Sequence, residues 1–244
     1  MNSEIHKIEH SSSLLNKKWK LIDYDERNAS YLSQKFKLSP FVGKLLSIRH
    51  IKEENIDFYL SPDINQHIPN PNNIKDMTLA TLRVVEAIKK NQKIGIIADY
   101  DVDGSTSASI LYKFLKNYNS SIILKIPNRL LDGYGPNIKL MKEMSDNKVD
   151  LLLTLDCGTT SNEIIDNKEF KNIDVIVIDH HLSEINLPNV LAIINPNRVD
   201  DTSDYKQLAA VGVTFLFLMY LRKKLREINK FNEIKKEPNL LSYL

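Results

Sequence analysis

Cysteine, net charge and long apolar runs are all scarce in this sequence of 244 residues. A single cysteine, Cys157, excludes an intramolecular disulfide, so the chain does not require an oxidising compartment. Its 33 basic and 31 acidic residues give a net charge of +2, which excludes DNA binding by bulk charge but not a local basic groove. The longest apolar run, residues 208–221, is shorter than the roughly 20 residues that span a bilayer, and the N-terminus lacks a signal-peptide core. We therefore expect a cytoplasmic protein that does not enter a membrane.

The first 73 residues have helical and irregular patterns. Residues 61–73 are rich in proline and asparagine, which is typical of a linker or surface loop. We therefore place a domain boundary after residue 73 and expect a helical N-terminal extension, residues 1–73, before it. The pattern predicts two helices there, at residues 31–38, capped by Ser30 or Asn28, and at residues 41–48, opened by Ser39 and Pro40.

From residue 77 onward, short apolar runs alternate with amphipathic stretches. The apolar runs predict five strands, at residues 94–98, 122–126, 151–155, 175–178 and 191–194. The other stretches predict helices, at residues 77–91, 106–117, 137–146, 160–169 and 208–228. Continuous apolar runs separated by helices are typical of a parallel sheet buried on both faces. Residues 74–244 are therefore predicted to form an α/β domain, doubly wound around a mainly parallel five-stranded sheet.

Aspartate and histidine side chains gather directly after three of these strands. Because parallel strands end at the same edge of a sheet, we expect them to converge there. Five carboxylates so close together repel one another unless cations neutralise them. The residues are Asp99, Asp101 and Asp103 after the first strand, Asp156 after the third, and Asp179, His180 and His181 after the fourth.

This combination of ligands favours a particular chemistry. Carboxylate oxygens with one or two imidazoles suit Mn²⁺ or Mg²⁺. Two such ions, roughly 3.5–4 Å apart, activate a water for in-line attack on phosphorus. The sequence therefore predicts a two-metal site that hydrolyses phosphoesters.

Simpler readings compete for each residue. An aspartate after a strand is often only a helix N-cap, and the isolated histidines at positions 6, 10, 50 and 67 are expected to be surface or core residues. Cys157 is expected to be a small buried thiol rather than a nucleophile. An EF-hand loop starting at Asp99 is excluded because Ile110 occupies its twelfth position, where a glutamate is required.

A second enzymatic reading remains open. Residues 101–106, DVDGST, resemble the signature of haloacid-dehalogenase phosphatases, in which the first aspartate, here Asp101, is a covalent nucleophile. That mechanism needs a later acidic pair at a strand end, and Asp200 and Asp201 lie in a polar loop instead. It also leaves Asp156 and the two histidines without a role.

Six segments resemble the DHH phosphoesterase superfamily, and within it the single-stranded-DNA-specific exonucleases of RecJ type. The resemblance covers roughly residues 39–244. The segments, in order along the chain, are ADYDVDGSTSASILYKFL, IPNRLLDGYG, TLDCG, VIDHH, INPNR and LAAVGV.

The resemblance implies a role for each site residue. Asp101, Asp103, Asp156 and His180 would be metal ligands, and Asp99 would lie in or beside the ligand shell. Asp179 would orient the histidines, and His181 would contact the scissile phosphate or assist the leaving group. Arg129 would hold a phosphate with its planar fork, and Tyr134, between two glycines, would stack a base.

The resemblance also implies an activity and partners. It implies degradation of single-stranded DNA from the 5′ end to mononucleotides, with two Mn²⁺ or Mg²⁺ ions, in DNA recombination and repair, where other repair proteins are possible partners. Members of the superfamily continue into a further metal-binding aspartate and further domains. We therefore expect an incomplete domain at the C-terminus with weak or no processive activity. A silent remnant that binds DNA or metal, and a relative acting on short oligonucleotides or cyclic dinucleotides, remain open.

Overall fold

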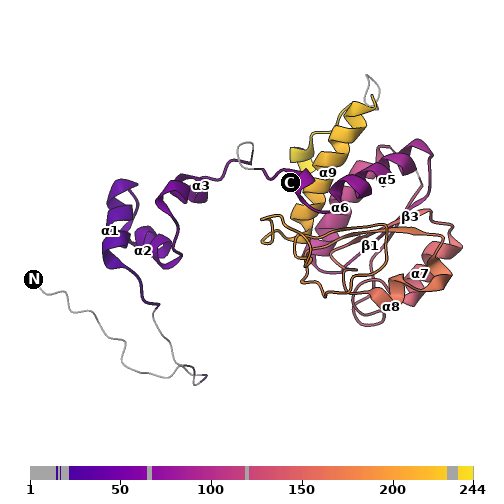
Figure 1. Cartoon of the computed structure of the whole chain (residues 1–244), viewed down its shortest axis with the longest axis horizontal. Coiled ribbons are helices and arrows are strands. Elements are labelled where there is room, and N and C mark those ends of the chain that lie inside the picture. The colour runs from indigo at the N-terminus through magenta and orange to yellow at the C-terminus, as the bar shows by residue number, and fades with distance from the viewer. Residues whose placement is uncertain are drawn as a thin grey trace, which may run out of the picture. The chain divides into compact units, whose positions relative to one another are not determined.

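The computed structural model describes residues 15, 17, 22–64, 68–118, 121–229 and 236–243 (Figure 1). The chain divides into two compact units, Met1–Ile68 and Pro69–Leu244. This division lies before the boundary expected after residue 73, because the short helix η2 (Pro71–Asn73) packs on helices of the second unit. Composition identifies a polar segment but does not show onto which neighbour it packs.

The first unit is built from α1 (Glu26–Lys35), α2 (Pro40–Ile48), η1 (Glu53–Asn55) and α3 (Ile56–Leu60). Its apolar centre consists of Leu32, Leu46 and Ile56. The second helix begins as predicted, with the Ser39 hydroxyl accepting a hydrogen bond from the Val42 N–H. The predicted start of the first helix is wrong, because neither Ser30 nor Asn28 is its N-cap. The Asp25 carboxylate caps the helix instead, so it begins five residues earlier, at Glu26.

The second unit contains a five-stranded sheet in the order β2-β1-β3-β4-β5, with every neighbouring pair parallel. All residues of β1, β3 and β5 are buried, which explains why these strands read as continuous apolar runs. The predicted five-stranded parallel sheet is confirmed. The strands are β1 (Ile94–Ala98), β2 (Ile122–Lys125), β3 (Leu151–Leu155), β4 (Asp174–Ile178) and β5 (Ala192–Ile194).

Helices cover both faces of this sheet, as predicted for a doubly wound fold (Figure 1). One face carries α5 (Met77–Lys89), α6 (Val102–Lys116) and α9 (Ala210–Glu227). The other carries α7 (Ile138–Asp146), α8 (Asn162–Ile165) and η3 (Lys168–Phe170), whose apolar residues join one core with alternate residues of the strands. The stretch predicted as one helix at residues 160–169 is therefore two short helices.

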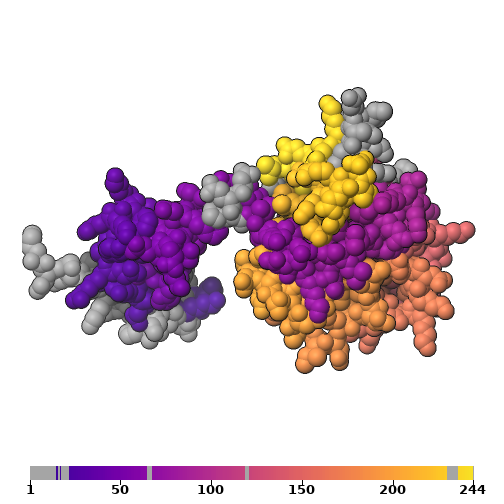
Figure 2. Space-filling model, turned by 45° about the horizontal axis from the view of Figure 1, so that its top comes forward, coloured from indigo at the N-terminus to yellow at the C-terminus, as the bar shows by residue number. Residues whose placement is uncertain are grey.

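The long apolar run near the C-terminus is α9, which packs on both α5 and α6. In Figure 2 yellow residues near the C-terminus lie beside purple residues, in keeping with the packing of α9 on α5. A short helix, η4 (Leu240–Tyr243), follows α9. Ten residues of α9 are buried, so its apolar character reflects packing inside this unit. Within the described ranges, none of the helices combines the length and the apolar character that a membrane crossing needs.

Candidate metal centre

Three aspartates are positioned by the sheet itself. Asp99, Asp156 and Asp179 each follow directly after a strand, and each backbone N–H donates to the last carbonyl of the neighbouring strand, at 3.1, 2.9 and 3.0 Å. The ladder therefore extends one residue beyond the apolar core and turns three carboxylates onto the same edge. All three side chains are buried, and Asp156 has a left-handed φ of 59°, a conformation that aspartate tolerates better than most residues.

The next two carboxylates come from the start of α6. Asp101 is its N-cap, with Oδ1 accepting from the Gly104 N–H at 2.9 Å. The helix therefore begins at Val102 rather than at residue 106. Glycine is required at position 104, because a Cβ there would lie 2.4 Å from the Asp99 carbonyl oxygen.

Asp103 lies in the first turn of α6 and joins it to α9. Its two carboxylate oxygens accept hydrogen bonds from the N–H groups of Ala210 and Val211, both at 2.7 Å. The N-cap of α9, Ala209, has no side chain to supply such bonds. The Asp103 carboxylate, on α6, thus pairs with free N–H groups at the N-terminus of α9 and balances the positive end of that helix.

The histidine pair completes the cluster. His180 Nε2 lies 3.4 Å from Asp156 Oδ1 and 3.6 Å from Asp103 Oδ2. His181 Nδ1 lies 2.8 Å from Asp179 Oδ1 and 3.9 Å from Asp156 Oδ1. The structure therefore brings together the residues that three separate strand ends contribute.

Two sets of side chains can each direct three ligand atoms to within 4.8 Å of one another. One set is Asp99, Asp101 and Asp156, and the other is Asp156, His180 and His181. Among the described residues, Asp103 belongs to neither set, although it lies beside His180. Asp156 is common to both sets.

The charges in this cluster are poorly compensated. Burial, together with repulsion from Asp103 and Asp101, raises the pKa of Asp156 to about 8. Burial also raises the pKa of Asp99, whereas the hydrogen bond from Gly104 lowers that of Asp101. Oδ1 of Asp99 and Oδ1 of Asp156 are buried and accept no hydrogen bond from the described residues. Bare, buried carboxylate oxygens of this kind fit a hard divalent cation.

Asp179 has a different environment from the other carboxylates. Its Oδ2 accepts from the Thr159 N–H, and its Oδ1 accepts from the His180 N–H and from His181 Nδ1. Burial acts to raise the pKa of Asp179, but these hydrogen bonds hold it below its usual value. In return, the bond to Asp179 raises the pKa of His181 to about 8. The contact with Asp179 therefore fixes the position of His181 Nδ1.

The segment after β2 contributes two predicted residues. The Tyr134 hydroxyl donates to the Asp156 carbonyl at 2.7 Å, and its ring meets His181 edge-on, with centroids 5.9 Å apart. The exposed Arg129 guanidinium lies over the Tyr100 ring, 5.5 Å from its centroid. Tyr134 therefore supports the site directly, and base stacking by its half-exposed ring stays a prediction.

Three residues without a predicted role hold the histidine segment, by which we mean residues 179–181. Asn195, Asn197 and Thr159 hydrogen-bond to that segment or to one another. The two asparagines closely follow β5, just as the aspartates follow their strands. Their position after a strand is the one feature of the sequence that indicates a place at the site. Because asparagine is uncharged, a pattern of charged residues does not include them.

The remaining polar candidates have structural explanations. Cys157 is buried as predicted, its thiol donates to the Leu155 carbonyl, and burial raises its pKa well above the usual value. Asp200 pairs with Arg198, so it does not face the acidic cluster as a phosphatase partner. His50 is exposed, and the histidines at positions 6, 10 and 67 lie outside the described residues.

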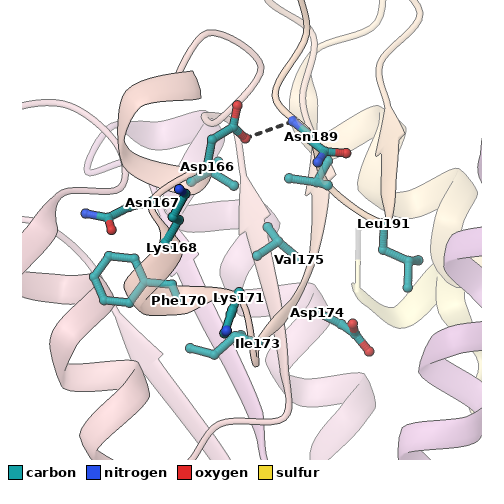
Figure 3. Close-up of a pocket in the computed structure, with 12 residues that line it drawn as sticks. Asp166, Asn167, Lys168, Phe170, Lys171, Ile173, Asp174, Val175, Asn189 and Leu191 are labelled. Atoms are coloured by element: carbon teal, nitrogen blue, oxygen red, sulfur yellow. Dashed lines mark hydrogen bonds between the residues drawn. The ribbon is translucent and has the colours of Figure 1, made fainter.

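A pocket of about 500 Å³ lies at the opposite edge of the sheet, around the amino ends of β4 and β5 (Figure 3). Asp174 and Leu191 line it beside Lys168 and Lys171, and it contains none of the predicted site residues. A second hollow, of about 410 Å³, lies beside the histidines and is lined by Tyr134, Gly158, Thr160, Asp179, His181 and Leu182. The hollow that accompanies the acidic cluster is therefore the second one.

Comparison with known proteins gives the same family from sequence. The model of the DHH family, N-terminal domain, matches residues 93–242. The single-stranded-DNA-specific exonuclease RecJ of Haemophilus influenzae is 34% identical over 207 residues, covering 84% of this chain and 35% of that protein. RecJ of Bacillus subtilis is 30% identical over 208 residues, covering 81% of this chain and 25% of that protein. The chain thus spans about a quarter to a third of the length of these relatives.

Solved structures agree with the fold. A crystal structure of exonuclease RecJ bound to manganese matches with a TM-score of 0.55 and 31% identity, covering 62% of this chain and 38% of that one. RecJ of Thermus thermophilus in complex with Mn²⁺ matches with a TM-score of 0.63 and 22% identity, covering 84% of this chain and 28% of that one. Since the family match includes the acidic cluster, both histidines and every strand of the sheet, the chain belongs to the DHH family.

Proposed function

We propose that this chain carries the metal-binding part of a single-stranded-DNA exonuclease that cleaves phosphodiester bonds from the 5′ end and releases mononucleotides. The observation that carries the proposal is the pair of ligand sets that share Asp156. The RecJ relatives are named single-stranded-DNA-specific exonucleases, and one of the similar structures is bound to manganese.

The donor set fits two Mn²⁺ or Mg²⁺ ions. Asp101, Asp156 and His180, which the two sets contain, are the proposed ligands. Asp103 is the fourth, because its Oδ2 lies 3.6 Å from His180 Nε2, and Asp99 lies in or beside the ligand shell. Buried carboxylate oxygens without hydrogen-bond donors favour a hard cation, and the imidazole favours Mn²⁺ over Mg²⁺. The bound ions would supply an activated water and neutralise charge on the phosphate.

His181 is the proposed proton donor. Its Nδ1 is held by Asp179 at 2.8 Å, which leaves Nε2 to face the substrate. The hydrogen bond to Asp179 favours the protonated form of the ring and raises the pKa of His181 to about 8 in the metal-free chain. The protonated ring can neutralise charge on the scissile phosphate or protonate the departing oxygen. Asp179 acts through His181 and is a positioning residue.

Arg129 and Tyr134 are the proposed substrate contacts. The Arg129 guanidinium is exposed and stacked on Tyr100, which leaves its planar fork free to approach two phosphate oxygens. The half-exposed ring of Tyr134 adjoins His181 and offers a surface on which a base can stack. Stacking suits single strands, because their bases are not paired.

The phosphatase alternative has no comparable support. Its nucleophile, Asp101, shares a ligand set with Asp99 and Asp156, and Asp200, one of the acidic pair it needs, is paired with Arg198. A catalytically silent remnant is the alternative that experiment must address.

The test is release of nucleotides from single-stranded DNA by the purified chain with Mn²⁺. We expect release that chelation abolishes, and that His180→Ala lowers at least about 100-fold. Asp200→Asn is the matched control, because it removes a carboxylate from the same domain without touching the cluster. Substrates blocked at the 5′ or the 3′ end give the direction. Equal release by wild type and His180→Ala would discard the assigned site, and no release by wild type would favour the silent remnant.

A further inference from the structure

The backbone of the histidine segment runs beyond the end of the sheet. The last ladder pair between β4 and β5 is Ile178 with Ile194, so the carbonyls of His180 and His181 have no strand opposite them. A backbone carbonyl that is half-buried and unbonded costs stability and permits the segment to adopt other conformations. Something outside the ladder must therefore hold it.

Two asparagines that closely follow β5 supply the missing donors. Asn197 Nδ2 donates to the His180 carbonyl at 2.6 Å, and Asn195 Nδ2 donates to the His181 carbonyl at 2.9 Å. On the other side of the same residues, both N–H groups donate to Asp179 Oδ1, at 2.7 and 3.3 Å. The two histidine residues are thus held through both their N–H and their carbonyl groups.

The asparagines are themselves held in place. Asn195 is fully buried, its Oδ1 accepts from the Asn197 backbone N–H at 2.8 Å, and its Nδ2 also donates to Thr159 Oγ1 at 3.0 Å. Thr159 in turn donates its N–H to Asp179. The polar groups therefore close a ring around the histidine segment, with the ends of β3, β4 and β5 as its three supports.

Asn197 also connects the histidines to the other side of the cluster. Its Nδ2 donates to the Lys206 carbonyl at 3.1 Å, in the segment that leads into α9. The first N–H groups of α9 hold the Asp103 carboxylate, and Asp103 lies 3.6 Å from His180 Nε2. One amide group thus bonds both to the backbone of His180 and to the segment before the helix that holds Asp103.

We propose that Asn195 and Asn197 are positioning residues, which orient the His180 and His181 rings toward the carboxylates of Asp103 and Asp156. Asn197 has the larger role because it bonds both to the His180 carbonyl and to the Lys206 carbonyl, in the segment that leads into α9. Only one measurement of this inference, the activity on single-stranded DNA, rests on the proposed function. The metal-binding and backbone measurements stand without that function.

The experiment compares Asn197→Ala and Asn195→Ala with Asn162→Ala in the full chain. Asn162 is the matched control, because its Nδ2 also donates to a backbone carbonyl, that of Asn186, at 3.0 Å and away from the histidines. Measurements are the Mn²⁺ dissociation constant, the melting temperature of the metal-free protein, hydrogen exchange of peptides containing residues 179–182, and kcat and KM on single-stranded DNA.

We expect Asn197→Ala to weaken Mn²⁺ binding about 10- to 100-fold and to lower kcat with little change in KM. Asn195→Ala should act in the same direction and less strongly. Hydrogen exchange at residues 179–182 should be faster in both variants even without metal. Asn162→Ala should leave the Mn²⁺ affinity, the exchange at residues 179–182 and kcat unchanged.

Mn²⁺ affinity and exchange within twofold of wild type in Asn197→Ala would overturn the proposal. If that variant does not fold, Asn197→Ser, which retains a shorter donor, carries the same test. Failure of both to fold would assign Asn197 a structural role and also overturn it. If the wild type releases no nucleotides, the proposed function fails, while the exchange and metal comparisons still decide this inference.

Discussion

Two clusters of charged side chains in the second unit contain similar residues but differ in how their charges are paired. One is the carboxylate cluster at the carboxyl edge of the sheet, formed by Asp99, Asp101, Asp103 and Asp156. The other, the arginine cluster, is formed by Asp76, Lys75, Asp200 and the buried Arg198.

In the arginine cluster every acidic group named has a cationic partner. Arg198 Nη1 lies 2.5 Å from Asp76 Oδ2, and its Nε lies 2.6 Å from Asp200 Oδ1. The same groups also close the free edge of β5, because Asp76 accepts from the Ile193 N–H and Arg198 donates to the Ile193 carbonyl. Pairing backbone groups of an edge strand prevents it from joining another strand, so this cluster has a structural role.

The carboxylate cluster has the opposite balance. Within the described residues, two of its buried oxygens, Asp99 Oδ1 and Asp156 Oδ1, have no donor, and the pKa of Asp156 is raised to about 8 rather than lowered. A protein that keeps such an arrangement gives up stability in the metal-free state, and binding of cations recovers it. The pairing of aspartates, and not their number, therefore separates a binding site from a structural ion pair.

The largest expected effect comes from removing the central cation of the arginine cluster. Arg198→Ala leaves the Asp76 carboxylate without its cationic partner and the Ile193 carbonyl without a donor, so we expect the free energy of unfolding to fall by about 3–5 kcal/mol. Chemical denaturation measures it. Arg129→Ala, which removes an exposed arginine beside the carboxylate cluster, is the control and should change stability by less than about 0.5 kcal/mol. Similar losses in both variants would contradict the assigned structural role.

The next effect concerns pH and the carboxylate cluster. Above pH 4 the unfolded chain ionises Asp156, whereas the folded, metal-free protein keeps it protonated up to about pH 8. Unfolding therefore releases a proton, and stability falls as pH rises from about 4 to about 8. We expect the metal-free melting temperature to be roughly 5 °C lower at pH 8 than at pH 6.

Two controls isolate this contribution. His181 acts in the same direction, because its raised pKa stabilises the fold below pH 6.5 and loses effect as pH rises through 8. Asp156→Asn should therefore reduce the pH dependence without abolishing it. Mn²⁺ should raise the melting temperature more at pH 8 than at pH 6, because it binds the ionised carboxylates. A pH dependence unchanged in Asp156→Asn would contradict the prediction.

The smallest effect has the opposite sign and belongs to the arginine cluster. Hydrogen bonds from Arg198 and Lys75 lower the pKa of Asp200 to about 2. Its stabilising contribution is therefore present above pH 4 and is lost as pH falls from 4 toward 2. Asp200 is half-exposed, so Asp200→Asn should cost less than about 1 kcal/mol at pH 7. The difference from wild type, followed by urea unfolding, should shrink at pH 3, and a constant difference would refute the pairing.

Much of the second unit was predictable because its strands are buried on both faces. Burial on both faces produces uninterrupted apolar runs, and β1 and β3 begin and end at the predicted residues. Short, polar or half-exposed elements carried weaker signals. The start of α6 was misplaced because its first turn consists of Asp101, Val102 and Asp103, which read as a loop until Asp101 is seen to cap it.

The residues of the candidate site also fall into those that the sequence could identify and those that it could not. Asp99, Asp156 and Asp179 could be named from sequence because each follows directly after an apolar run. Asn195 occupies the same position after β5 but carries no charge, so nothing in its residue type pointed to the histidines. The hydrogen bonds from α9 to Asp103 were also inaccessible, because they join residues more than 100 positions apart.

By itself, the sequence determined the parallel α/β fold and the residue types at the edge of its sheet, because local patterns of burial and of strand ends are written along the chain. Only the tertiary structure decided which carboxylates remain unpaired and which meet a cation. That difference depends on distances of a few ångströms between segments far apart in sequence, such as Asp76 and Arg198 or Asp103 and α9. Electrostatic energy depends on these distances and on burial, and neither can be read from the order of residues.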